Sequence, residues 1–398
     1  MKKLSIWSVQ FVGLGVALLS SLFVLRLLID SSFRMVYSFV PQIANGLQVS
    51  ITVFGWLLMV RSSSALFSPL LGSLADRYGR RNVMIFALLA QVVGMFGIAL
   101  MRGWWAAFPI FFSGLAVNSF LPAQQAYISD MVPFERRGRA LATADSAFAI
   151  SGIIVMPLVG WMIDTLGWRA PFLALGISGI LAAVLTWRFL PEVRESRLEQ
   201  TPDAKMSSLL KERNIQASLA VAALLFTGVG TFMTFWSIWL SADFDFDSVD
   251  LGLMATRIGM AELLGVVLAG LIVDRLGKQR SSLLGVAMSA LFFGLIPLSR
   301  GDLGMIRIAL IVTVFWLEYS IVSLFPLYGE QAPQARATIF ALVALANGVG
   351  LAAGPVLATS LWAGYGLTAI TSVAAVSLGL SALLIFFFLK ETVSEEIR

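Results

Sequence analysis

The sequence predicts an all-α membrane protein whose twelve transmembrane helices form two pseudo-symmetric six-helix bundles. Three observations lead to this fold class. The 398 residues are 58% hydrophobic and 13% charged, with a mean hydropathy of +0.87. Long apolar runs recur along the chain, and landmarks of the first half return about 200 residues later. Soluble chains average about 25% charged residues, so this composition argues against a soluble fold.

Twelve apolar segments are long enough to cross a bilayer as helices, which takes about 20 residues each. In the first half they lie at 17–41, 51–74, 82–101, 105–129, 140–163 and 168–190. In the second half they lie at 214–240, 251–273, 281–299, 303–327, 338–362 and 366–389. The polar stretch 191–213 predicts a linker. We therefore expect an N-terminal bundle over 1–190 and a C-terminal bundle over 214–398.

The first segment begins like a signal peptide, because Lys2 and Lys3 precede an apolar run. No small-residue cleavage site follows, and the apolar character continues to Pro41. We expect this segment to be retained as the first membrane helix.

The basic residues predict the orientation of the chain. With the N-terminus inside, the inner segments hold 20 of the 28 Lys and Arg residues and the outer segments hold four. Cytoplasmic loops carry such an excess of positive charge. Both termini are therefore expected in the cytoplasm, with the protein in the inner (plasma) membrane. This distribution also explains the net charge of +5, so we expect the lipid bilayer and no nucleic acid as a partner.

Repeated landmarks predict two homologous halves in parallel orientation. The stretch GSLADRYGRR (72–81) returns as GLIVDRLGKQR (270–280), which places Asp76 and Asp274 198 positions apart. Pro157 and Pro355 have the same separation. The stretch SDMVPFERRGRA (129–140) meets GEQAPQARA (329–337), with the pairs Asp130/Glu330 and Arg136/Arg336 200 positions apart.

These stretches resemble signatures of the major facilitator superfamily. GSLADRYGRR is similar to its loop 2–3 motif, carried here by Gly72, Asp76, Arg77, Gly79 and Arg80, and the second copy carries Asp274, Arg275 and Gly277. DMVPFERRGRALA resembles its loop 4–5. GIIVMPLVGW and GLAAGPVLA resemble the Gly-Pro motif of drug:proton antiporters, at Gly152, Pro157, Gly350, Gly354 and Pro355.

The resemblance implies alternating access to a central cavity by a monomer that moves a small molecule, with protons as the coupling ion. It implies that Asp76 latches the inner side, and that helices 5 and 11 lie between the halves. Two departures weaken the antiporter pattern: Ile110 stands where an Arg usually precedes Gly114, and Met156 replaces a Gly. Export of amphipathic or drug-like molecules is our first hypothesis. Symport or uniport of a sugar, an organic anion or a lipid remains the alternative.

Charged residues inside membrane helices are costly and usually face a cavity or one another. Arg26, Asp30 and Arg34 share one face of the first helix, because they are spaced by four. Counting from the helix ends puts Asp30 and Arg61 at similar depth, so we predict that they pair near the midplane. Asp30 is then the leading proton carrier, whereas the alternative is a permanent ion pair that positions helices. Cationic Arg34 and Arg61 would suit an anionic substrate.

Three further polar residues are candidates for the cavity. Glu262 and Glu318 lie in the eighth and tenth segments, where each is either functional or hydrogen-bonded to a neighbouring helix. Asn118 lies in the fourth segment, which normally lines the cavity in the resembled family. Asp145 begins the fifth segment near the cytoplasm, and Arg26 is its candidate partner.

Nothing in the sequence indicates an enzyme. The chain contains no Cys and no His, which leaves no thiolate and no imidazole for catalysis or metal binding. GVGLAAGP lies within an apolar segment rather than after a strand, so it does not predict a nucleotide-binding loop. We expect no cofactor, no metal and a gradient rather than ATP as the energy source.

Overall fold

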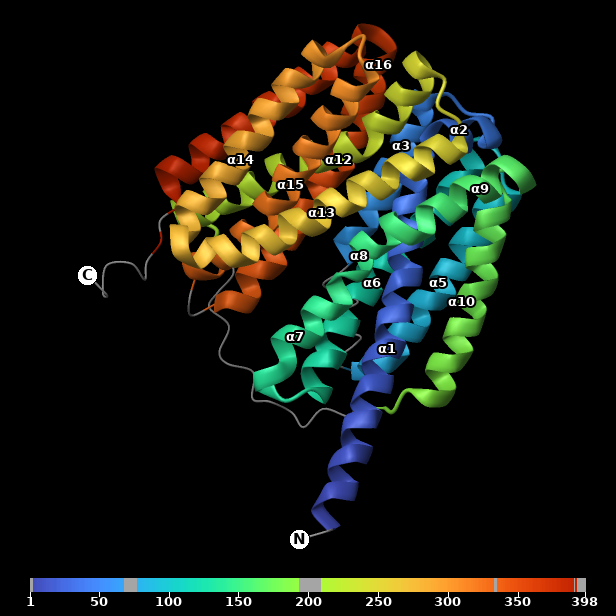
Figure 1. Cartoon of the computed structure of the whole chain (residues 1–398), viewed down its shortest axis with the longest axis vertical. Coiled ribbons are helices and arrows are strands. Elements are labelled where there is room, and N and C mark those ends of the chain that lie inside the picture. Colours follow the sequence, from blue (N-terminus) through green and yellow to red (C-terminus); the bar gives the residue numbers. More distant parts are fainter. Residues whose placement is uncertain (1–2, 68–76, 193–208, 333–334, 390, 392–398) are drawn as a thin grey trace.

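The computed structural model describes residues 3–67, 77–192, 209–332, 335–389 and 391, which form helices joined by short turns (Figure 1). Gly72 and Asp76, and most of the predicted linker, lie outside these residues. Side chains are described from residue 18 onward, apart from a few positions that include Arg336.

The first half of the chain contains the helices up to residue 189. They are α1 (Lys3–Ser38), α2 (Val40–Leu47), α3 (Ile51–Ser63), η1 (Ser64–Phe67), α5 (Arg80–Leu100), η2 (Gly103–Ala106), α6 (Ala107–Met131), α7 (Phe134–Asp145), α8 (Ala147–Ile150), η3 (Ser151–Val155), α9 (Met156–Leu166) and α10 (Ala170–Phe189). The elements α7, α8, η3 and α9 follow one another and cover the fifth predicted segment. In this series η3 is one turn of π-helix.

The second half has longer uninterrupted helices. They are α12 (Arg213–Phe244), α13 (Ser248–Leu276), α14 (Lys278–Leu295), η4 (Ile296–Ser299), α15 (Leu303–Gln331) and α16 (Arg336–Phe388). The backbone of α16 is broken at Gly366, where φ is 70° and ψ is −166°. Gly354 packs on Thr231 of α12, and beyond the break Ser377 and Ser381 bond Leu224 and Val221 of the same helix. The two limbs of α16 therefore run in opposite directions and correspond to the last two predicted segments.

The lengths and composition of these helices confirm an all-α membrane protein. Within the described ranges, nine helices are long and apolar enough to cross a membrane, and up to ten if the bent pair of α2 with α3 and η1 forms one span. This number is below the twelve expected because α16 counts once although it contains two limbs, and because α1 is not among the helices counted. Large apolar side chains such as Trp105 and Leu298 are 81% and 77% exposed, as expected for a surface that faces lipid.

Residues with positive φ occur at corresponding turns of the two halves, as the internal repeat predicts. Every Gly with positive φ in the described part of the chain has a counterpart in the other half, giving the pairs Gly79/Gly277, Gly103/Gly301 and Gly167/Gly366. The separations are 198, 198 and 199 positions. The two other residues with positive φ, Gln48 and Asp245, are 197 apart. The halves thus share the positions of their turns as well as their helices.

The two halves meet mainly near the turns at 48–50 and 245–247, which we call the distal end. There α13 packs on α9 and η3, and α16 packs on α3. The approach is close: a Cβ added to Gly252 of α13 would lie 2.8 Å from the carbonyl oxygen of Met156. The opposite end, which carries the turns at Arg77–Arg81 and Gly277–Arg280, we call the basic end.

Candidate functional site

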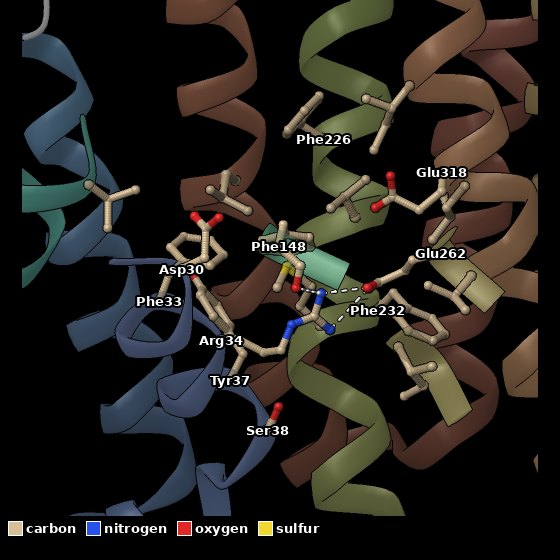
Figure 2. Close-up of a pocket in the computed structure, with 18 of the residues that line it drawn as sticks. Asp30, Phe33, Arg34, Tyr37, Ser38, Phe148, Phe226, Phe232, Glu262 and Glu318 are labelled. Atoms are coloured by element: carbon tan, nitrogen blue, oxygen red, sulfur yellow. Dashed lines mark hydrogen bonds and ion pairs between the residues drawn. The ribbon is translucent and has the colours of Figure 1, made fainter. Parts of the chain in front are cut away.

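A cavity of about 450 Å³ lies between the two halves (Figure 2). Helices α1, α6 and α8 line it from the first half, and α12, α13, α15 and α16 line it from the second. Its walls are largely apolar, and seven aromatic residues contribute: Phe33, Tyr37, Phe148, Phe226, Phe232, Trp236 and Phe325. Its volume is within the range of sites that hold drug-sized ligands.

An ion pair crosses this cavity and joins the halves. Arg34 of α1 donates from Nη1 to Glu262 Oε1 at 3.1 Å and from Nη2 to Glu262 Oε2 at 2.5 Å, as Figure 2 shows. Both side chains are buried. A bidentate pair between Arg and a carboxylate fixes orientation as well as distance. The sequence predicted that both residues face the cavity, but it did not predict that they bind each other.

The elements α8 and η3 supply the rest of the Arg34 site. Arg34 Nη2 also donates to the carbonyl oxygen of Phe148 at 3.3 Å, and its Cζ lies 4.1 Å from the centre of the Phe148 ring. A Cβ on Gly152 would lie 3.2 Å from Arg34 Cζ, so this Gly makes room for the guanidinium. Pro157, whose nitrogen carries no hydrogen, follows two residues after the π turn.

Asp30 binds Arg26 rather than Arg61, so the predicted Asp30–Arg61 pair is wrong. Arg26 Nε donates to Asp30 Oδ2 at 2.8 Å, and Arg26 Nη2 lies 3.2 Å from Asp145 Oδ1. Arg26 also approaches Gln124 Oε1 of α6 at 3.5 Å. Arg26 lies one helical turn before Asp30 on α1, which places the two side chains together. Arg61 is directed toward Ser113 of α6 instead. The expected partnership of Arg26 with Asp145 is confirmed.

Arg61 is packed between α1 and α6 without a carboxylate partner among the described residues. Its side chain is 1% exposed, and its Nε donates to Ser113 Oγ at 3.0 Å. The guanidinium carbon lies 4.6 Å and 5.6 Å from the ring centres of Phe33 and Tyr37. Nη1 and Nη2 make no hydrogen bond to any described residue. Arg61 is not part of the cavity wall; Phe33 and Tyr37 are.

Glu318 and Asn118 both line the cavity, as predicted from their segments. Asn118 Nδ2 donates to Ser64 Oγ of η1 at 2.8 Å. Within the described residues Glu318 makes neither an ion pair nor a hydrogen bond, and the charged groups whose fields act on it are Glu262 and Arg34. Figure 2 shows its carboxylate directed into the cavity between Phe226 and Glu262.

The repeated motif builds matching ion pairs at the basic end. Arg80 binds Asp130, and its Nη1 donates to the carbonyl oxygen of Ala126 at 2.6 Å. In the second half Lys278 binds Glu330. Each pair ties the helix after the repeated turn to the end of the next helix, and each stays within one half. Lys278 was not among the predicted residues, although it stands 198 positions after Arg80.

Carboxylates that follow the last helix of each half add to this arrangement. Glu391 Oε2 accepts from the backbone nitrogen of Lys278 at 3.1 Å, at the first turn of α14. Glu192, 199 positions earlier, lies 3.8 Å from Arg81 Nη2. The backbone groups at a helix N-terminus attract negative charge, which favours both placements.

Other motif residues lie apart from these pairs. Arg77, Asp274, Arg275 and Arg136 are exposed, and the side chain of Arg336 lies outside the described residues. Gly350 and Gly354 serve packing within the second half, because a Cβ on Gly354 would lie 2.5 Å from the nitrogen of Thr231. Pro355 approaches Gly55 of α3, and this contact does join the halves.

Two duplicated helical halves around a charged cavity within a membrane are the architecture of a secondary transporter. The family model of the Major Facilitator Superfamily matches residues 22–236 and again 218–398. The chain therefore belongs to the Major Facilitator Superfamily, and it is a transporter rather than an enzyme.

Two curated relatives that match over most of their length are named for multidrug resistance. The chain is 26% identical over 358 residues to the "Multi-drug resistance efflux pump PmrA homolog" of Lactococcus lactis, covering 85% of this chain and 86% of that protein. It is 27% identical over 383 residues to the "Multidrug resistance protein MdtG" of Yersinia enterocolitica, covering 91% of each. These matches place it near the drug:proton antiporter group.

A solved structure supports the fold. The crystal structure of a D-xylose-proton symporter superposes with a TM-score of 0.75, covering 94% of this chain and 98% of the symporter. The two sequences are 16% identical. At this identity the similarity concerns the fold and not the substrate.

Proposed function

We propose that the protein is a proton-coupled exporter of amphipathic or drug-like small molecules, working by alternating access as a monomer. The supporting observation is the cavity between the halves, whose walls are mostly aromatic and aliphatic while its charges come from a few side chains. Such a surface suits molecules recognised by apolar area rather than by many directed hydrogen bonds. The name of the PmrA homolog, an efflux pump, supports the same direction of transport.

Asp30 is the proposed proton site. Arg26 is shared between the carboxylates of Asp30 and Asp145, so this cluster holds one positive charge against two negative charges. A proton on one of the two carboxyl groups makes the cluster neutral. Since Asp30 also lines the cavity, the arrival of substrate and the charge of this cluster can influence each other.

The basic end is proposed to face the cytoplasm of a cell whose plasma membrane holds the protein. This orientation places both termini and the ion pairs Arg80–Asp130 and Lys278–Glu330 on the inner side. It follows from the excess of Lys and Arg in the turns at that end.

An anionic solute is a weaker candidate than an amphipathic compound. That alternative relied on Arg34 and Arg61 as free cations. Arg34 is held by Glu262 on two oxygens, and Arg61 is buried behind Phe33 and Tyr37.

Transport by the purified protein in liposomes tests the proposal. A pH gradient is expected to drive movement of a lipophilic compound in the unmodified protein. Asp30→Asn is expected to abolish the dependence on the gradient, while Asp164→Asn, an exposed carboxylate at the distal end of α9, leaves it intact. Gradient-driven transport that is undiminished in a folded Asp30→Asn protein would remove Asp30 from the proton path.

A further inference from the structure

We infer that the cavity selects substrates carrying a single positive charge, and that Glu318 is the residue that selects them. This inference rests on the proposed function, because it names the class of substrate that the exporter moves. The starting observation is that the carboxylates in the cavity wall outnumber the cations that could pair with them.

The cavity wall contains more carboxylates than cations. Arg26 and Arg34 line it together with Asp30, Glu262 and Glu318. Arg26 is engaged by Asp30 and Asp145, and Arg34 by both oxygens of Glu262. Among the described residues, these contacts leave the Glu318 carboxylate without a cation of its own.

The surroundings of Glu318 favour a cationic ligand over an anionic one. Glu262 and Arg34 are the charged groups that act on it, and Arg34 is already committed to Glu262. An ionised carboxylate in a largely apolar site is costly unless an opposite charge compensates it. A ligand cation beside Glu318 supplies that compensation, whereas a ligand anion meets two carboxylates.

Aromatic rings in the cavity wall also favour a cationic ligand over an anionic one. Phe226, Phe232 and Trp236 of α12 and Phe325 of α15 line the cavity with it. The faces of such rings attract cations, and their area binds the apolar body of an amphipathic molecule. When the cluster of Arg26, Asp30 and Asp145 carries the proton proposed above it is neutral, and Glu262 is held by Arg34. Among the described residues that line the cavity, Glu318 is then the one carboxylate left to a ligand cation, which is why we specify a single charge.

Two lipophilic ions of matched shape and opposite charge, tetraphenylphosphonium and tetraphenylborate, test this inference. Binding is measured by quenching of tryptophan fluorescence in the full-length protein in lipid nanodiscs. We expect tetraphenylphosphonium to bind at least about tenfold more tightly than tetraphenylborate. Glu318→Gln is expected to reduce that preference by about tenfold or more, and Asp164→Asn is expected to preserve it.

Glu318→Asp keeps the charge and provides a second variant if the amide perturbs folding; it is expected to retain a preference for the cation. Equal binding of the two ions, no binding of either, or an unchanged preference in folded Glu318→Gln would overturn the inference. The proposed function has a separate readout. A result in which binding of tetraphenylphosphonium depends on Glu318 while a proton gradient fails to move this ion in liposomes would contradict the proposed proton-coupled export. That result would leave the inferred selection by charge intact.

Discussion

Arg34 and Glu262 join the two halves of the transporter inside its cavity, across 228 positions of sequence, through hydrogen bonds of 3.1 Å and 2.5 Å. Among the described residues, neither side chain has an ion-pair partner within its own half. The pair is therefore a contact that movement of the halves must preserve or break. Its energetic behaviour can be measured by removing one or both members.

Removing one member of this pair is expected to destabilise the protein strongly. Arg34→Met leaves Glu262 buried without its counter-ion, a change that typically costs about 3–5 kcal/mol. Adding Glu262→Met to the same chain is expected to recover most of that loss, because no unpaired charge remains. Thermal unfolding of both single variants and the double variant checks this. Losses that simply add in the double variant would show that the two side chains are not coupled.

Arg61→Met is expected to stabilise the fold. Arg61 is buried with one hydrogen bond, to Ser113, and its two terminal nitrogens have no hydrogen-bond partner among the described residues. A Met removes this desolvated charge and keeps apolar volume against Phe33 and Tyr37, so we expect a gain of about 1–3 kcal/mol. Arg61→Lys, which retains a charge but loses the planar stacking, is the control and should destabilise. A Met variant less stable than the Lys variant contradicts this explanation.

Gly252→Ala is expected to open the distal end. A Cβ there would lie 2.8 Å from the carbonyl oxygen of Met156, so α13 and α9 cannot keep their present distance. Gly270→Ala on the same helix is the matched control, because its Cβ would meet no atom within 4 Å. The chain has no Cys, so Ser38→Cys on the cavity wall provides a single label. We expect an impermeant maleimide added from the distal side to label it faster with Gly252→Ala than with Gly270→Ala.

Arg80→Ala and Lys278→Ala are expected to have similar and additive effects. Both remove the cation of an ion pair whose side chains are 7–25% exposed, so each is expected to cost about 1–3 kcal/mol. The two pairs lie in different halves and share no partner, so their effects on the free energy of unfolding should sum. Denaturation of the two single variants and the double variant measures this. A double variant that loses much more than the sum would reveal coupling between the halves at the basic end.

The apolar segments, the repeat and the residues of the cavity wall were predictable because each depends on local composition and spacing. Of the six residues predicted for the cavity from their positions in apolar segments, Arg61 does not line it, and the other five do: Asp30, Arg34, Glu262, Glu318 and Asn118. Lys278 could also have been found, since the repeat places it opposite Arg80.

The partners of the charged residues could not be predicted in the same way. Depth along the helix axis suggested Arg61 for Asp30, but pairing also depends on how each helix is rotated about its axis. The structure directs Arg61 toward Ser113 and leaves Asp30 to Arg26. The choice of Glu262 for Arg34 depends on how the two halves approach each other, which no local pattern encodes.

The π turn at Ser151–Val155 determines which side of its helix faces α1. A π turn contains one residue more than an α-helical turn, and one residue corresponds to a rotation of about 100° around the axis. Phe148 and Asp145 precede this turn, and both contact arginines of α1. Deleting a single amino acid within 151–155 would swing both groups a quarter-turn or more away from Arg34 and Arg26, so the length of the chain at this place matters as much as its composition.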